Sequence, residues 1–204
     1  MPAWGLVHVF DTTINYVSMD NKAMFRYRIY ATGFVTVSIW LLLAWEYFHR
    51  GIPSHHLFAD PKLPSVSNAW GGVVLPLLTA YLLYRIQKRI EAYSEVAVRD
   101  ATLRKIMCSL CLATSFGLTL AVSFTFDYSS VSELVFFAIL VLALIFPIYR
   151  AEFYLGFVLA LTYFFGAVLP TFIGGVVVLI SATANFGIHP LIFKLKNKFE
   201  MKQR

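Results

Sequence analysis

The chain has 204 residues, of which 59% are hydrophobic and only 14% are charged, with 17 Lys and Arg against 11 Asp and Glu. Soluble domains are about one-quarter charged and just under half apolar, so this composition excludes an ordinary soluble domain and a disordered chain. Two Cys in the whole chain exclude a disulfide scaffold.

The first predicted element covers residues 4–17. A segment of this length beside an apolar run is typical of an amphipathic helix that lies along a membrane interface, because it is too short to cross the hydrocarbon core. The apolar residues that recur at helical spacing in it are Leu6, Val7, Phe10, Ile14 and Val17.

Six apolar runs follow along the chain. A helix needs about 20 mostly apolar residues to cross a bilayer. The runs cover residues 30–48, 69–84, 106–126, 131–149, 153–169 and 171–188. A single helix over the last two runs would be about 54 Å long, which exceeds any bilayer. We therefore predict a tight hairpin between them, with Pro170 at its turn.

The basic residues divide unevenly between the two sides of the six predicted spans. Arg50 and Lys62 alone lie on one side, and the other fifteen Lys and Arg lie on the other, in the N-terminal segment, the 85–105 connection, the turn at 150–152 and the C-terminal tail. Cytoplasmic loops carry such an excess, so we expect both termini in the cytoplasm and an inner or plasma membrane location. The basic residues are thereby explained, and no nucleic-acid site is expected.

The fold class expected from these patterns is an all-α integral membrane protein. It is a six-helix transmembrane bundle with an N-terminal interfacial amphipathic helix, in one domain over 1–204. The third to sixth spans have no charged residue in their middles, which argues against a proton pump or a voltage sensor. No P-loop, Gly-x-Ser-x-Gly, His-Glu-x-x-His or dinucleotide fingerprint is present.

The connection at 46–72 carries most of the candidate functional residues. Pro53, Pro61 and Pro64 exclude a plain helix there, and long, stiffened connections in compact proteins are more often functional than decorative. Two acids on the next outer connection could approach it. The candidate ligand-binding residues are His55, His56, Asp60, Asn68, Trp70, Asp127 and Glu133.

Three interpretations of this connection stay open. His55, His56 and Asp60 could bind zinc, although adjacent His side chains reach one ion only through a turn. Alternatively, the connection covers a cavity open to the outside, with Trp70 stacking and Asn68 hydrogen bonding to a ligand. In the third interpretation it is only a linker that caps the second span.

The leading hypothesis from the sequence is a polytopic membrane protein that binds or transports a small solute from the outer face. The alternatives are a membrane-embedded enzyme with a metal or His/Asp site on the same loop, and a non-catalytic scaffold subunit. The expected partners are the lipid bilayer, a small-molecule ligand and a membrane partner subunit.

In architecture alone, the six spans and the structured first outer loop look like the substrate-binding subunits of energy-coupling-factor transporters. The first span, however, lacks a stripe of small residues for docking another helix.

Overall fold

The computed structural model describes residues 21–49, 51, 54–56, 65–188 and 190. The predicted interfacial helix at 4–17 lies outside these residues. The described elements, in chain order, are α2 (Asn21–His49), β1 (Ser54–His56), β2 (Ser65–Ser67), the 3₁₀-helix η2 (Asn68–Trp70), α3 (Gly71–Glu91), α4 (Val96–Thr125), α5 (Ser129–Ile145), α6 (Ala151–Phe165), α7 (Val168–Thr183) and the π-helix η3 (Ala184–Ile188).

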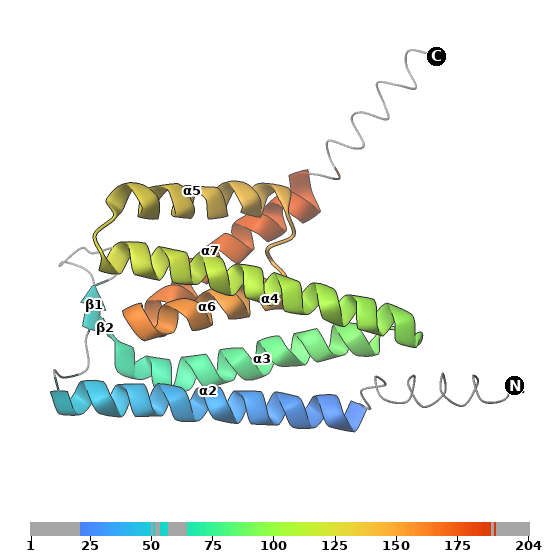
Figure 1. Ribbon diagram of the computed structural model, residues 1–204, viewed down its shortest axis with the longest axis horizontal. Helices are drawn as coiled ribbons and strands as arrows, with labels where there is room; N and C mark the ends of the chain where they lie inside the picture. Colours follow the sequence, from blue (N-terminus) through green and yellow to red (C-terminus); the bar gives the residue numbers. More distant parts are fainter. Residues whose placement is uncertain (1–20, 50, 52–53, 57–64, 189, 191–204) are drawn as a thin grey trace, which may run out of the picture.

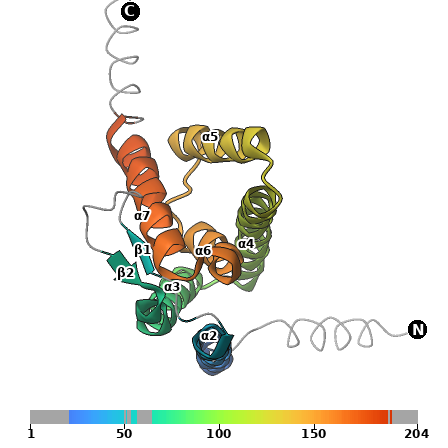
Figure 2. The same ribbon diagram turned by 90° about the vertical axis from the view of Figure 1, so that its left-hand side faces the viewer.

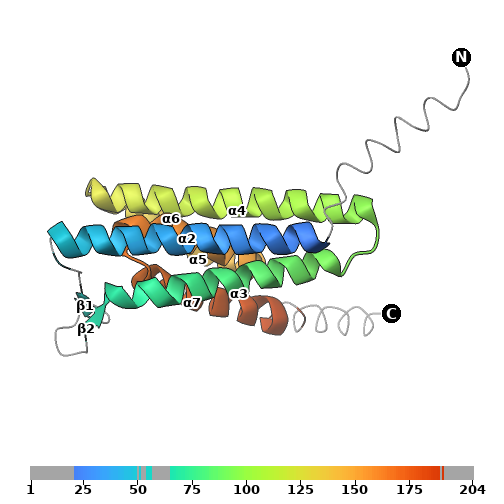
Figure 3. The ribbon, with the colours of Figure 1, turned by 90° about the horizontal axis from the view of Figure 1, so that it is seen from below.

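The six α-helices lie side by side and run in alternating directions (Figures 1 and 3). We call the end at which α2, α4 and α6 begin and α3, α5 and α7 end the basic end. Every Lys and Arg of the described residues belongs to a helix terminus or turn at this end. They are Lys22, Arg26, Arg28, Arg85, Lys88, Arg89, Arg99, Arg104, Lys105 and Arg150. The hairpin of β1 and β2 lies at the opposite end.

Among the described residues, four helical segments are long and apolar enough to cross a membrane, namely Lys22–His49, Asn68–Glu91, Val96–Thr125 and Val168–Gly187. The helices α5 and α6 are apolar but shorter. Large apolar side chains of α2 point away from the rest of the protein, with Phe34 75% and Phe48 80% exposed. An exposed apolar surface of this size needs another apolar medium to cover it, which supports a membrane protein.

The described helices follow the predicted apolar runs in order, and four of them are long enough to cross a membrane, but one turn is misplaced. The sequence prediction put Pro170 at the turn between the last two runs, and this is wrong: Pro170 is the third residue of α7. The turn lies at Gly166 and Ala167 instead, and Gly166 adopts φ +72°. Proline is tolerated in the first turn of a helix because the backbone N–H groups there have no intrahelical partner.

The helix α6 lies in the middle of the arrangement, with α3, α4 and α7 around it (Figure 2). Small residues bring α4 close to it. A Cβ on Gly117 would lie 2.7 Å from the Cβ of Ala160, and a Cβ on Gly156 would lie 2.8 Å from the carbonyl oxygen of Leu110. Helices that bury glycine at their contact approach closely enough for backbone packing.

Unlike α3, α4 and α7, the helix α5 does not pack closely on α6. It packs on α4 and α7 instead. Towards the opposite end, the space between α4, α6 and α7 is filled by a buried cluster that includes Leu120, Ala121 and Leu161. Towards the basic end, the space between α4, α5, α6 and α7 is not filled by side chains, and a cavity remains.

Candidate ligand-binding cavity

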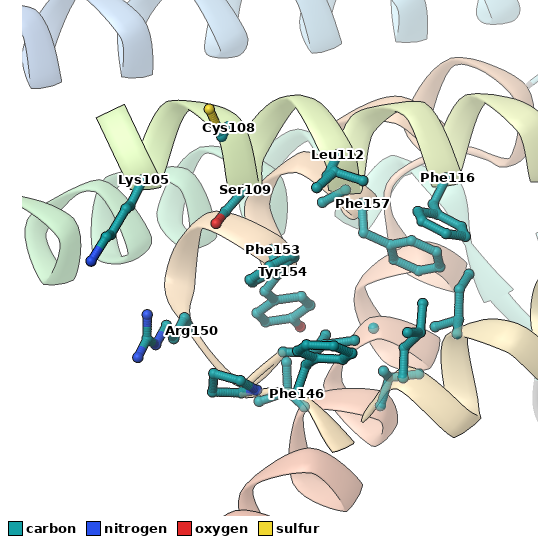
Figure 4. A pocket seen from close by; sticks show the side chains of 18 residues that line it. Lys105, Cys108, Ser109, Leu112, Phe116, Phe146, Arg150, Phe153, Tyr154 and Phe157 are labelled. Atoms are coloured by element: carbon teal, nitrogen blue, oxygen red, sulfur yellow. The ribbon is translucent and has the colours of Figure 1, made fainter. Parts of the chain in front are cut away.

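A cavity of about 630 Å³ lies between α4, α5, α6 and α7, on the basic side of the buried cluster (Figure 4). Its volume falls in the range of small-molecule sites, roughly 300–1,000 Å³. Most of its wall is apolar, and its aromatic lining residues are Phe116, Phe146, Phe153, Tyr154 and Phe157. The hydroxyl of Tyr154 is occupied, because it donates a hydrogen bond of 2.8 Å to the carbonyl oxygen of Thr171.

The charged residues of the cavity lie at one end of it. Lys105 comes from α4 and Arg150 stands directly before α6, and both are exposed. Figure 4 shows the two side chains on the same side of the cavity, with Ser109 one helical turn along α4 from Lys105. In the part of the chain that the structure describes, no Asp or Glu lines the cavity. The cavity is therefore an apolar chamber with two cationic side chains, Lys105 and Arg150, at one end, which we call its mouth. Such a site suits an anion with an apolar tail.

The turn that carries Arg150 is held by polar side chains of α7 and η3. The hydroxyl of Ser181 donates to the carbonyl oxygen of Phe146 (3.0 Å) and accepts from the backbone N–H of Tyr149 (3.3 Å). The Asn185 carboxamide donates to the same Phe146 oxygen (3.3 Å). This turn would otherwise leave backbone groups without partners inside an apolar protein, which is costly. The mouth is thus a built feature of the fold.

A second charged feature lies on α6 next to the mouth, and the sequence analysis did not identify it. Glu152 is only 1% exposed, and its Oε1 accepts a hydrogen bond of 2.9 Å from Nη2 of Arg89 at the end of α3. The second oxygen of the carboxylate has no hydrogen-bond partner in the described residues. Charged groups in such surroundings are retained only when they are paired. The pair ties the first turn of α6, and with it Arg150, to α3.

The sequence carried a weak signal for this pair. Glu152 is the only acid in the first turn of α6, where the positive end of the helix dipole favours a carboxylate. Arg89 is one of several basic residues in the 85–105 segment, all of which the charge distribution already explained. Nothing in their spacing shows that these two residues meet.

Asn68, a predicted ligand-binding residue, has a structural role. It is 2% exposed, its Oδ1 accepts from the backbone N–H of Ala167 (3.1 Å), and its Nδ2 donates to Glu46 (3.3 Å). It thereby joins α2, η2 and the turn between α6 and α7. A Cβ at Gly166 would overlap the carboxamide, so the glycine makes room for it. Both polar ends of the side chain are occupied by protein.

Three other predicted site residues have described side chains, and all three are exposed. Trp70 is 63% exposed, and Glu133 is exposed on α5. Asp127 is exposed and has φ 57°, a left-handed conformation that Asp tolerates better than most residues. No hydrogen bond or ion pair among the described residues joins Asp127 or Glu133 to Asn68 or Trp70.

The predicted zinc ligands are only partly covered. The backbones of His55 and His56 lie in β1, paired antiparallel with Val66 and Ser65 of β2. Their side chains and all of Asp60 lie outside the described residues. Within the described residues, no group of three or more His, Cys, Asp and Glu could hold a metal ion. The zinc site remains a prediction.

Comparisons with known proteins place the chain in no family. No protein-family description, no curated protein and no solved structure matches it. The architectural likeness to transporter subunits therefore has no support from sequence or structure similarity, and function has to be inferred from the cavity itself.

Proposed function

We propose that this protein is an integral membrane protein that binds a single-chain amphipathic anion in the cavity between α4, α5, α6 and α7. The ligand places its apolar chain in the chamber and its carboxylate or phosphate between Lys105 and Arg150. The observation that carries the proposal is the combination of an apolar lining with two cations at the mouth and no lining acid. Either charge sign could enter an apolar chamber, but only an anion gains from this mouth.

The proposed topology is six membrane spans with the basic end in the cytoplasm. The four long helices meet the length requirement, and α5 and α6 lie among them in alternating direction. At 1.5 Å per residue, the 17 residues of α5 and 15 of α6 span only about 22–26 Å, so their flanking turns complete the crossing. The clustering of cations at one end supports this orientation through the positive-inside rule.

Cysteine labelling on intact cells tests the topology. In a background in which Cys108 and Cys111 are replaced by Ala, a membrane-impermeant maleimide should modify the Ser129→Cys variant and spare the Ser94→Cys variant. Ser129 is exposed at the opposite end and Ser94 is exposed at the basic end. Both variants should react after the cells are opened. Labelling of the Ser94→Cys variant alone on intact cells would reverse the orientation.

Charge reversal at the mouth tests the ligand class. We expect the double variant Lys105→Glu and Arg150→Glu to lose at least about tenfold in affinity for dodecanoate, because two attractions of roughly 0.3–0.5 kcal/mol each become repulsions of similar size. Both residues are exposed, so folding should be little affected. Native mass spectrometry of the purified protein in nanodiscs measures the bound fraction. Dodecyl phosphate and dodecanol are titrated in parallel, which separates phosphate, carboxylate and neutral headgroups.

The matched control is the double variant Arg85→Glu and Arg104→Glu. It changes the net charge by the same amount at the same end, through exposed residues that do not line the cavity. It should bind dodecanoate like the native protein. If the native protein binds dodecanol as tightly as dodecanoate, or if both double variants lose affinity equally, the cations do not recognise a headgroup and the proposal is wrong.

A further inference from the structure

The end of the cavity farthest from Lys105 and Arg150, which we call its floor, limits the length of the chain that the cavity can hold. The lining residues farthest from the basic end are Phe116 on α4, Ile139 on α5 and Phe157 on α6, and each belongs to, or packs against, the buried cluster. Ile139 is 6% and Phe157 is 8% exposed. These three side chains therefore bound the cavity at the end away from Lys105 and Arg150. A chain that enters with its headgroup at the mouth meets these three side chains.

The distance from mouth to floor follows from helix geometry. Eleven residues separate Lys105 from Phe116 on α4, and seven separate Arg150 from Phe157 on α6. At 1.5 Å per residue these separations are about 16 Å and about 10 Å. A C–C bond of about 1.5 Å advances an extended chain by about 1.25 Å, so the chamber takes roughly 8–13 bonds.

The volume agrees with this length. If each methylene or headgroup atom takes about the volume of a water molecule in the liquid, roughly 30 Å³, the cavity of about 630 Å³ holds about twenty such groups. One chain of medium length with its headgroup fits. The two chains and the headgroup of a phospholipid do not.

We infer that Phe116, Ile139 and Phe157 act as a molecular ruler: they limit the length of the bound chain and make the site selective for single chains of about 8–14 carbon atoms. This inference rests on the proposed function and adds the chain length. For chains shorter than the upper length that fits, each added methylene should tighten binding about fourfold. This factor corresponds to about 0.8 kcal/mol for each methylene that is buried. Beyond this length, the chain end has no further apolar space and has to bend or displace a floor side chain, so the affinity falls.

Competition among chain lengths tests the ruler. The native protein is equilibrated in nanodiscs with an equimolar mixture of straight-chain carboxylates of 8, 10, 12, 14, 16 and 18 carbon atoms, and native mass spectrometry reads the distribution of bound masses. We expect a maximum within the range of 8–14. Phe116→Ala should move the maximum by about two to four carbon atoms to longer chains, because it opens the floor.

A second variant shortens the chamber. Leu142 is a half-buried lining residue of α5, between Ile139 and the mouth, and Leu142→Trp should move the maximum to shorter chains. This variant adds apolar volume to a cavity, so it keeps the test valid if Phe116→Ala does not fold. Phe137→Ala is the matched control, because Phe137 is 67% exposed on the same helix and lines no part of the cavity. It should leave the maximum unchanged.

The outcomes separate the ruler from the site. If no carboxylate binds the native protein above the level of an empty nanodisc, the proposed function itself fails. If carboxylates bind but the maximum stays in place in both Phe116→Ala and Leu142→Trp, the site stands and the ruler is wrong. A bound distribution that rises without limit to 18 carbon atoms in the native protein would also overturn the ruler.

Discussion

Replacing Arg89 with Met should destabilise the folded protein by about 3 kcal/mol. The carboxylate of Glu152 is almost completely buried, and Arg89 is its only ion-pair partner in the described residues. Removal of one partner leaves an unpaired charge in an apolar environment, which costs about 3–5 kcal/mol for a fully buried pair. The lower figure applies because the Arg89 side chain is 30% exposed. Thermal unfolding of the purified protein should show a midpoint lowered by about 6–12 °C.

Two further variants give this prediction its controls. The double variant Arg89→Met and Glu152→Gln should recover most of the loss, because no buried charge remains unpaired. Arg85→Met, on the same helix, removes an exposed cation and should cost less than about 1 kcal/mol. If Arg89→Met unfolds like Arg85→Met, the ion pair does not stabilise the contact between α3 and α6.

Adding a single methyl group to Gly156 should cost about 2 kcal/mol. The Cβ of Ala at this position would lie 2.8 Å from the carbonyl oxygen of Leu110 and 3.1 Å from the Cβ of Ala113. The nearest atom belongs to the backbone, so α4 and α6 have to move apart, and overpacking of this kind costs about 1–3 kcal/mol. Since these two helices carry Arg150 and Lys105, the same shift should also weaken ligand binding.

Gly33→Ala is the matched control for Gly156→Ala. Gly33 lies within α2 and a Cβ there would have no neighbour within 4 Å. The same substitution should therefore stabilise the protein by roughly 0.5–1 kcal/mol, because Ala is the better helix former. Equal unfolding midpoints for the two variants would mean that the close contact of α4 and α6 does not exist.

The helices could be predicted from the sequence because the signal for them is local. Each apolar run is continuous, and the runs are separated by charged or polar turns at 50–68, 92–95 and 126–128. The turn between α6 and α7 was misplaced because Pro170 was weighed above Gly166. Gly166 supplies the positive φ of the turn and the room for Asn68, and neither requirement is visible without the neighbouring segment.

The candidate site predicted from the sequence lies at the end opposite to the proposed cavity, and it stays a prediction. Polar residues are conspicuous in the connection after α2, whereas a cavity is a property of four helices packed together. Lys105 and Arg150 counted as topology signals in the sequence, and Phe116 and Phe157 as ordinary span residues. Asn68 looked available for a ligand because its protein partners, Glu46 and Ala167, are 22 and 99 residues away in the chain.

Photolabelling with a dodecanoate analogue that carries a diazirine at the end of its chain tests the central claim most directly. The protein is irradiated in nanodiscs, and the labelled peptides are sequenced by mass spectrometry. Labels should fall on the floor of the cavity, at Phe116, Ile139 or Phe157, and excess unlabelled dodecanoate should remove them. Labels confined to lipid-facing residues such as Phe34 and Phe48 of α2, unaffected by competitor, would contradict binding of the chain in the cavity.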